Sequence, residues 1–129
     1  MRCCTDSPPG QLLLGIRQFN NREWYECHET VEALWMAEPH GNVRLLYQGI
    51  IQLAVALHHW RNGNYAGTMA LLSSGADILS QIPDICMWID VSRLISDAHR
   101  LHRLLDMKGE RFMTSIDDAD LIKITTVSV

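Results

Sequence analysis

The sequence is poor in lysine and in long apolar runs, and it has no CxxC pair. Lysine occurs only at Lys108 and Lys123, the arginines are scattered, and the formal net charge is -4 at pH 7. Proteins that bind the phosphate backbone rely on clustered Lys and Arg, so we expect no nucleic-acid partner. The longest mostly apolar stretch, residues 45–57, contains two glutamines and is too short to span a bilayer. We therefore also expect no membrane partner.

The N-terminus has no apolar run of signal-peptide length, which favours a cytoplasmic protein. The four cysteines, at Cys3, Cys4, Cys27 and Cys86, do not have the CxxC or Cys/His spacing of a zinc site. In the cytoplasm such cysteines are usually reduced, and we expect four free thiols.

The chain has 129 residues, of which 47% are hydrophobic and 20% charged, as in one globular domain. Apolar residues at helical spacing, separated by Gly, Pro and Asn, predict five helices with short connections. Their expected ranges are about 11–19, 21–35, 42–61, 64–81 and 87–107. The fold class is therefore an all-α, single-domain helical bundle with an extended C-terminal tail. We divide the chain into a flexible N-terminal tail (1–10), the bundle (11–109) and the tail (110–129).

The helix predicted over 42–61 is apolar around most of its circumference, which is typical of a helix at the centre of a domain. Gly49 lies in its middle, where glycine costs about 1 kcal/mol relative to alanine. This indicates either the close approach of another helix or a packing defect. The expected core comprises Leu13, Ile16, Trp24, Val31, Leu34, Trp35, Leu46, Ile50, Leu53, Val55, Leu57, Leu71, Leu72, Ile78, Leu79, Leu94, Leu101 and Leu104.

The C-terminal tail contains strand-forming residues from Leu121 to Val127 but has no partner strand in the sequence. A single strand is not stable alone, so the tail is expected to lie on the bundle or on a second subunit. We predict a homodimer that buries part of the tail or of the fifth helix.

Acidic residues and a histidine share one side of the helix predicted over 21–35. At 100° per residue, Glu26, Glu29 and Glu32 fall within about 120° of one another, and His28 lies beside Glu32. His28 and Glu32 are four residues apart, so their side chains can touch. We predict that the His28 ring is at least partly buried, lies against Trp24 or Trp35, and is hydrogen-bonded to a carboxylate, most favourably that of Glu32.

Polar residues form a second stripe on the helix predicted over 42–61. Arg44, Gln48, Gln52 and His59 follow one face, and His58 lies about 80° away. If the two helices pack antiparallel, the acids of one can face the amides and guanidinium of the other. The candidate polar network or binding patch comprises Glu26, Glu32, Trp35, Arg44, Gln48, Gln52, His58 and Arg61.

Three interpretations of this patch remain open. It can be a buried polar network that fixes the helix register, since buried carboxylates and amides need partners. It can bind a small molecule without chemistry. It can also bind a divalent metal that activates water, with His28, Glu29 and Glu32 as ligands and Glu29 and His28 as catalytic residues. The metal pattern is weak because HExxE lacks the second histidine of HExxH, so no cofactor beyond this optional metal is expected.

Two segments resemble the domain-of-unknown-function 309 family: FNNREWYECHETVEALW at 19–35 and RLLYQGIIQLAVALHHWRNGNYAG at 44–67. The resemblance covers about residues 12–72. It implies an all-helical domain found widely in bacteria and archaea, whose members are sometimes labelled metal-dependent hydrolases, with no established activity. Cys27 and Tyr47 stand where family members carry Ala and Phe or Leu. The residues that carry the resemblance are Glu26, His28, Glu29, Glu32, Trp35, Gln48, Gly49, Gln52, His58, Arg61, Gly63, Asn64 and Gly67.

Overall fold

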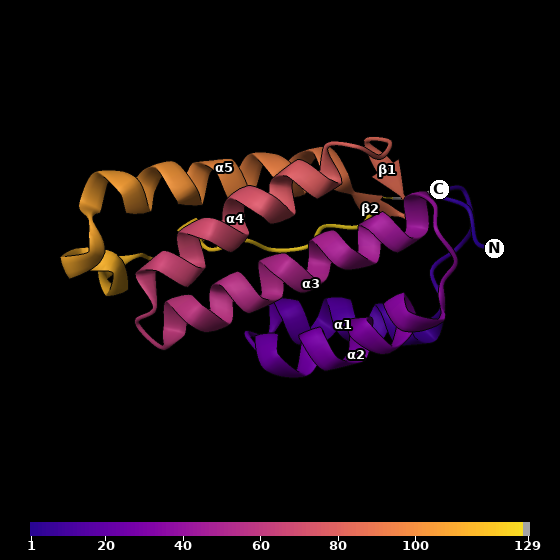
Figure 1. Ribbon diagram of the computed structural model, residues 1–129, viewed down its shortest axis with the longest axis horizontal. Helices are drawn as coiled ribbons and strands as arrows, with labels where there is room; N and C mark the ends of the chain where they lie inside the picture. The colour runs from indigo at the N-terminus through magenta and orange to yellow at the C-terminus, as the bar shows by residue number, and fades with distance from the viewer. Residues whose placement is uncertain (128–129) are drawn as a thin grey trace.

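The longest helix, α3 (Asn42–Arg61), lies between α2 (Trp24–Ala37) and α4 (Tyr65–Leu79) and packs against both (Figure 1). On the outer sides, α1 (Gly10–Asn20) packs on α2, and α5 (Val91–Lys108) packs on α4. The computed structural model describes residues 1–127, and within that range these five are the α-helices. The predicted all-α class is confirmed.

The centre of the bundle is built on α3, because its apolar residues cover most of its circumference. Its buried residues include Leu46, Ile50 and Leu53, each at most 1% exposed. Gly49 allows the approach of α4, since a Cβ at this position would lie 2.5 Å from the Leu79 side chain. Close helix approach is therefore the reason for this glycine, and a packing defect is not needed to explain it.

The connections between the helices follow local signals only in part. Asn64 caps α4 as predicted: its side chain accepts a hydrogen bond from the Gly67 amide at 2.9 Å. The predicted start of α2 at Asn21 is wrong. Asn21 instead ends α1, where its amide donates to the Arg17 carbonyl, and α2 begins at Trp24.

A short hairpin precedes α5, where the sequence predicted helix from residue 87. Its strands are β1 (Ile85–Cys86) and β2 (Ile89–Asp90), joined by Met87 and Trp88 at positive φ. Such turns usually contain Asn or Gly, and neither residue is present at these two positions to indicate a turn. Burial stabilises the turn instead, because Met87 is fully buried and its sulfur accepts a hydrogen bond from the hydroxyl of Tyr47.

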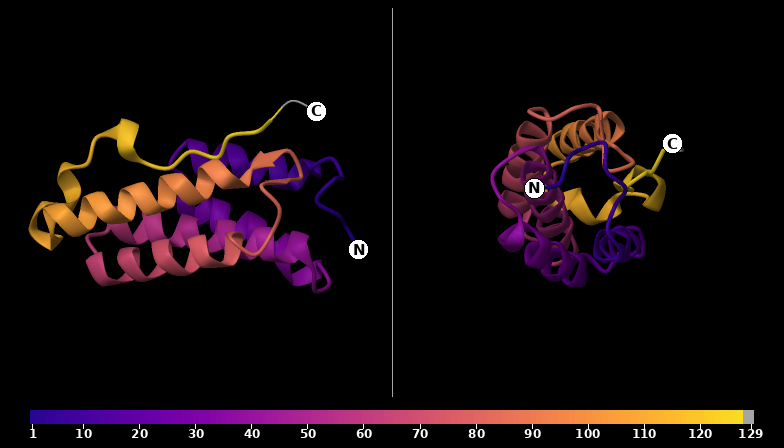
Figure 2. Two further views of the ribbon diagram at one scale, coloured as in Figure 1. Left: turned by 90° about the horizontal axis from the view of Figure 1, so that it is seen from above. Right: turned by 90° about the vertical axis from the view of Figure 1, so that its right-hand side faces the viewer.

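The C-terminal segment closes the bundle between α1 and α5 (Figure 2). Two short 3-10 helices, η1 (Glu110–Ser115) and η2 (Asp118–Asp120), lead into an extended stretch over 121–127. The Asn20 side chain of α1 donates to the Ile124 carbonyl at 3.0 Å and accepts from the Ile124 amide at 2.8 Å. The tail therefore lies on its own bundle, the first of the two expected alternatives.

This position removes the reason for expecting a dimer from an unpaired tail. Leu121, Ile122 and Ile124 are buried within the chain, and Thr126 forms a bridge with Ile89. The homodimer remains a prediction, which light scattering at micromolar concentration would test.

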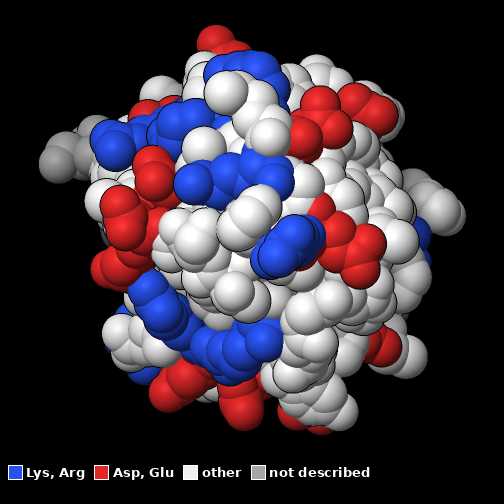
Figure 3. All heavy atoms as spheres, turned by 90° about the vertical axis from the view of Figure 1, so that its left-hand side faces the viewer, with Lys and Arg blue, Asp and Glu red and all other residues white. Residues whose placement is uncertain are grey.

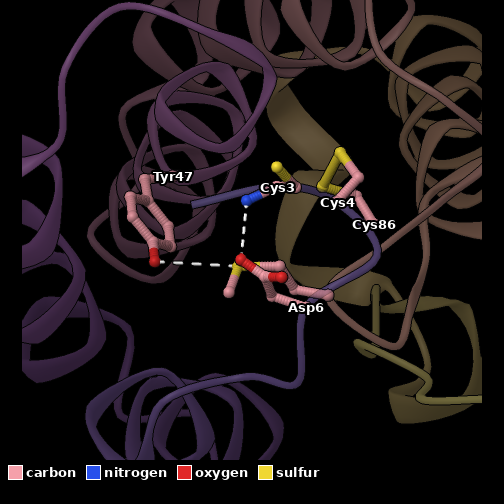
Figure 4. Close-up of a disulfide and its surroundings, with 6 residues drawn as sticks. Cys3, Cys4, Asp6, Tyr47 and Cys86 are labelled. Carbon is pink, nitrogen blue, oxygen red and sulfur yellow. Dashed lines mark hydrogen bonds between the residues drawn. A yellow bond between two sulfur atoms is a disulfide. The ribbon is translucent and has the colours of Figure 1, made fainter. Parts of the chain in front are cut away.

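The expectation of four free thiols is wrong, because Cys4 forms a disulfide with Cys86 (Figure 4). The two residues are 82 positions apart, and a pairing of this kind cannot be deduced from sequence alone. Cys3 is free and exposed, and Cys27 is free and buried. Residues 1–9, expected to belong to a flexible tail, are thus attached to the hairpin through Cys4. The division of the chain into a bundle and two tails stays a prediction.

Most of the predicted core is confirmed, and one member is wrong. Leu13 is 37% exposed, because the face of α1 that packs inward carries Leu12, Ile16 and Phe19. Trp35 and Val55 are only half-buried, as are Leu34, Leu71, Ile78 and Leu104. Within residues 1–127, none of the helices has both the length and the apolar character needed to cross a membrane.

Candidate ligand-binding groove

The seam between α2 and α3 contains two hollows, which together we call the α2–α3 groove. The first has a volume of about 170 Å³ and the second about 250 Å³. The first is lined by Trp24, Tyr25, His28, Val55 and His58. The second is lined by Glu32, Trp35, Gln48, Ile51 and Gln52.

Helical spacing explains why these residues meet. On α2, Trp24, His28, Glu32 and Trp35 are separated by four, four and three positions, which places them on one face of the helix. On α3, Gln48, Gln52, Val55 and His58 follow with steps of four, three and three. The two faces oppose one another across the seam, so the groove runs along both helices.

Aromatic and imidazole rings dominate the first hollow. Tyr25 is 47% exposed, and its ring centroid lies 5.5 Å from that of His28 and 5.5 Å from that of His58. Trp24 is buried and meets Trp60 edge to face, with 6.2 Å between ring centroids. Tyr25 thus joins the imidazole of one helix to that of the other, above a tryptophan held in the core.

His28 forms the contact predicted for it. Its Nε2 lies 2.9 Å from Oε2 of Glu32, and the His28 side chain is 27% exposed. The predicted burial and carboxylate partner are confirmed. The prediction placed Trp24 or Trp35 against this ring; the structure places Tyr25 there, and Trp24 lines the same hollow.

Three polar atoms of the groove lining are buried without a hydrogen-bond partner among the protein atoms of residues 1–127. They are the indole Nε1 of Trp24, the indole Nε1 of Trp35 and Nδ1 of His58. A buried polar group without a partner typically costs about 1–3 kcal/mol, so such groups are rare in folded proteins. Their concentration in one groove sets this seam apart from the rest of the bundle.

Hydrogen-bonding groups dominate the second hollow. Oε1 of Gln52 accepts from the Ser74 hydroxyl of α4, which fixes the amide and leaves its NH₂ group as a donor. Gln48 and Glu32 add a second amide and a carboxylate. The Trp35 ring and the Ile51 side chain form the apolar part of this hollow.

Among residues 1–127, neither arginine of the predicted patch forms an ion pair with the acids of α2. The Arg44 guanidinium lies 4.1 Å from the Trp35 ring centroid, and its Nε donates to the Trp35 carbonyl at 3.3 Å. The Arg61 guanidinium lies 4.4 Å from the Trp24 ring centroid. Flat guanidinium groups bind well to tryptophan faces, and both arginines therefore stack on rings instead of neutralising Glu32.

Charges of both signs surround the Arg61 end of the groove. Arg61 donates to the Arg22 carbonyl, and Arg22 forms an ion pair with Asp118 of η2. The Arg22 guanidinium beside Asp118 holds the pKa of that carboxyl below its usual range. Figure 3 shows this end of the molecule, on which basic and acidic side chains are interspersed.

The three predicted metal ligands do not all come together: His28 and Glu32 are in contact, and Glu29 lies apart from them. Among residues 1–127, no group of three or more His, Cys, Asp and Glu side chains is arranged to hold a metal ion. Glu29 is exposed and lines neither hollow, because it lies 100° from His28 around α2. Glu26 is also exposed and outside both hollows. Of the four polar residues predicted on this side of α2, the groove contains His28 and Glu32.

Four lining residues were not predicted as site residues: Trp24, Tyr25, Ile51 and Val55. The sequence did contain a signal for two of them, since Trp24 and Val55 continue the same four- and three-residue steps as the polar positions. Six residues that carry the family resemblance do line the groove: His28, Glu32, Trp35, Gln48, Gln52 and His58.

Comparison with known proteins confirms the resemblance. Residues 12–71 match the family model described as "Domain of unknown function (DUF309)". The chain is similar to the "Uncharacterized protein YpuF" of Bacillus subtilis (strain 168), with 41% identity over 58 residues, 45% of this chain and 33% of that protein. It is also 30% identical over 63 residues to an "Uncharacterized protein" of Aquifex aeolicus (strain VF5), over 49% of this chain and 17% of that protein. The matches thus span a third or less of the length of these relatives.

Proposed function

We propose that the α2–α3 groove, which lies within the DUF309 segment of this chain, binds a small organic molecule with an apolar ring and an amine. The observation that carries this proposal is the pair of adjacent hollows on one seam. One hollow is lined by rings and the other by hydrogen-bonding groups, so an amphipathic ligand can occupy both. Concave sites with an apolar lining and a few placed polar groups are typical of ligand binding.

The ring-lined hollow favours an aromatic or cycloaliphatic group. Trp24, Tyr25 and the two imidazoles present flat faces and edges, and aromatic groups pack on such surfaces in stacked or edge-to-face arrangements. Tyr25 is half-exposed, so it can rotate to admit a ring without opening the core.

The polar hollow favours a hydrogen-bond donor, and an ammonium group above all. Within residues 1–127, the only side chain within ion-pair distance of the Glu32 carboxylate is His28, which contacts one of its two oxygens. The second oxygen and the Gln48 amide remain to accept hydrogen bonds. The arginines that could neutralise Glu32 are stacked on the tryptophans. A charge-assisted hydrogen bond to an ammonium group is stronger than one between neutral groups.

A purely structural network accounts for less of this arrangement. The polar contacts are pairwise, His28 with Glu32 and Gln52 with Ser74, and they do not form one connected network between α2 and α3. A satisfied network would also include His58 Nδ1 and the two indole Nε1 atoms, which lack protein partners. The seam is therefore not a fully satisfied polar network within residues 1–127.

Ligand-observed NMR with matched probes tests the proposal on the full chain. The probes are phenylalkylamines with spacers of increasing length, and the corresponding phenylalkyl carboxylates. We expect the amines to bind and the carboxylates to bind at least about tenfold more weakly, which corresponds to about 1.4 kcal/mol. Equal binding of both series, or of neither, would contradict the proposal.

Two variants of α2 form a matched pair for this experiment. Glu32→Gln removes the carboxylate that lines the second hollow, and Glu29→Gln makes the same change on an exposed residue outside it. We expect Glu32→Gln to weaken amine binding about tenfold and Glu29→Gln to leave it within about twofold. If both variants weaken binding equally, the amine is attracted by general negative charge and not by the groove.

A further inference from the structure

The N-terminal segment forms a second feature of the molecule, independent of the groove. It contacts Glu38 in the connection between α2 and α3, which we call the α2–α3 corner. Residues 1–9, which we call the N-terminal strap, cross from this corner to the β1–β2 hairpin. At one end, the Arg2 amide donates to the buried Glu38 carboxylate at 3.0 Å. At the other, the Cys4 carbonyl accepts from the Met87 amide at 2.7 Å, and Cys4 is bonded to Cys86 (Figure 4).

The three cysteines near this point differ in exposure. Cys86 is fully buried, Cys4 is half-buried and Cys3 is exposed. Cys4 is thus the more exposed of the two bonded residues, so we expect a thiol from solution to attack its sulfur, with Cys86 as the leaving group. The strap around Cys4 belongs to a short irregular segment, whose amide contacts can open without disturbing the helices.

We infer that Cys4 and Cys86 form a redox-modification site whose substrates are dithiols and their disulfides, and whose oxidised form fastens the N-terminal strap. In the reducing direction, one thiolate of a dithiol attacks the Cys4 sulfur. The Cys86 thiolate leaves and takes up a proton, giving a mixed disulfide at Cys4. The second thiolate of the dithiol then attacks its own sulfur in that mixed disulfide and releases Cys4. Two protein thiols are formed, and the dithiol becomes a cyclic disulfide, so atoms and electrons balance.

The reverse reaction consumes a disulfide of the same class and restores the Cys4–Cys86 bond. Reduction leaves the strap attached only through α1 and through its hydrogen bonds. The strap then no longer holds the Glu38 corner and the Met87 turn together. The burial of Cys86 and its distance in sequence from Cys4 make the bond dependent on the folded chain, whereas the exposure on the Cys4 side keeps it reversible.

Cysteine labelling of the full chain tests this inference, because Cys27 is a built-in reporter of global unfolding. Cys27 is fully buried in the core, far in sequence from the disulfide. The oxidised protein is incubated with dithiothreitol, quenched at intervals with iodoacetamide, and analysed by peptide mass spectrometry. We expect Cys4 to become labelled at least about tenfold faster than Cys27, since opening of the strap costs less than global unfolding. Labelling of Cys4 and Cys27 at one rate, or four free thiols in protein kept under oxidising conditions, would overturn the inference.

Hydrogen exchange on two neighbouring variants tests the role of the strap. Cys4→Ser removes the Cys4–Cys86 disulfide. Cys3→Ser removes an exposed thiol and keeps the disulfide. We expect the Arg2 and Met87 amides to exchange about tenfold faster in Cys4→Ser than in Cys3→Ser, with unchanged protection in α3. Equal exchange in the two variants would show that the bond does not fasten the strap. A similar rise throughout α3 would show a global effect in place of a local one.

Discussion

At the scale of single residues, burial determines the chemistry of Cys27 more than its neighbours do. Burial raises the pKa of its thiol from 9.0 to about 12. Between these two values the folded protein keeps a proton that the unfolded chain releases. Ionisation of this thiol therefore does not affect the free energy of unfolding well below pH 9. Above pH 9 it lowers that free energy as pH rises, by at most about 1.4 kcal/mol per pH unit.

Chemical denaturation at two pH values measures this effect. Between about pH 8 and about pH 10.5, the free energy of unfolding of the unmodified chain should fall by about 2 kcal/mol more than that of Cys27→Ala. Tyr47, whose pKa is also raised mainly by burial, contributes equally to both proteins and cancels. An identical pH dependence in the two proteins would show that the Cys27 thiol is not protected from ionisation.

Gly49 is the residue at which the approach of two helices is most sensitive to a single methyl group. Gly49→Ala gains about 1 kcal/mol in helix propensity, but its Cβ would lie 2.5 Å from Leu79. Overpacking typically costs about 1–3 kcal/mol, so we expect a net loss of about 1 kcal/mol in urea unfolding. Gly10→Ala is the control, because nothing lies within 4 Å of its added Cβ. A Gly49→Ala protein as stable as Gly10→Ala would mean that α4 moves freely away from α3.

At the scale of helices and strands, prediction succeeded where the signals are local. The limits of α3 and the cap of α4 follow from nearby apolar periodicity, Asn62-Gly63 and Asn64. The hairpin before α5 was missed because Met87 and Trp88 occupy positive φ without a glycine or asparagine. Tertiary contacts, including the Tyr47–Met87 bond, determine that turn, and these cannot be read from the adjacent residues.

The groove shows the same limit for side chains. Helical spacing predicted that His28 and Glu32 touch, because both lie on one helix. It did not predict the partners of Arg44 and Arg61, since a guanidinium group can reach a carboxylate or a ring on the neighbouring helix. Spacing within one element is thus a good guide to contacts, and contacts between elements need the packed structure.

The joint between α1 and the C-terminal segment depends on one side chain. Asn20→Ala removes both hydrogen bonds to the Ile124 backbone, each worth about 1 kcal/mol. We expect a loss of about 2 kcal/mol in unfolding free energy and faster hydrogen exchange at the Ile124 amide. Asn21→Ala, on the next and exposed residue, should cost less than about 0.5 kcal/mol. Equal effects of the two changes would show that the segment is held by apolar burial alone.

At the scale of the whole molecule, the segment that matches the family model is shorter than the part of the chain that forms the core. The family match ends at residue 71, within α4, whereas the core continues through α5 and the C-terminal segment. Of the 32 buried apolar residues found among residues 1–127, 14 lie beyond residue 80. The faces of α3 and α4 that residues 12–71 leave open are therefore covered by sequence outside the match to the family model.

Because so much of the core lies beyond residue 80, we predict that a fragment ending after α4 does not fold cooperatively. A chain of residues 10–80 would expose the side of α4 that packs on α5, and it loses about two-fifths of the buried apolar residues. Fully burying one such side chain contributes about 1.5–3 kcal/mol, while the net stability of a domain is only about 5–15 kcal/mol. We expect the fragment to retain helical far-ultraviolet circular dichroism but to lack near-ultraviolet signal and to bind a hydrophobic dye. The control is the full chain with Cys4→Ser, which lacks the disulfide and keeps α5, so that loss of the bond is separated from loss of the core. A sharp, single thermal transition of the fragment would show that the first four helices form an independent folding unit.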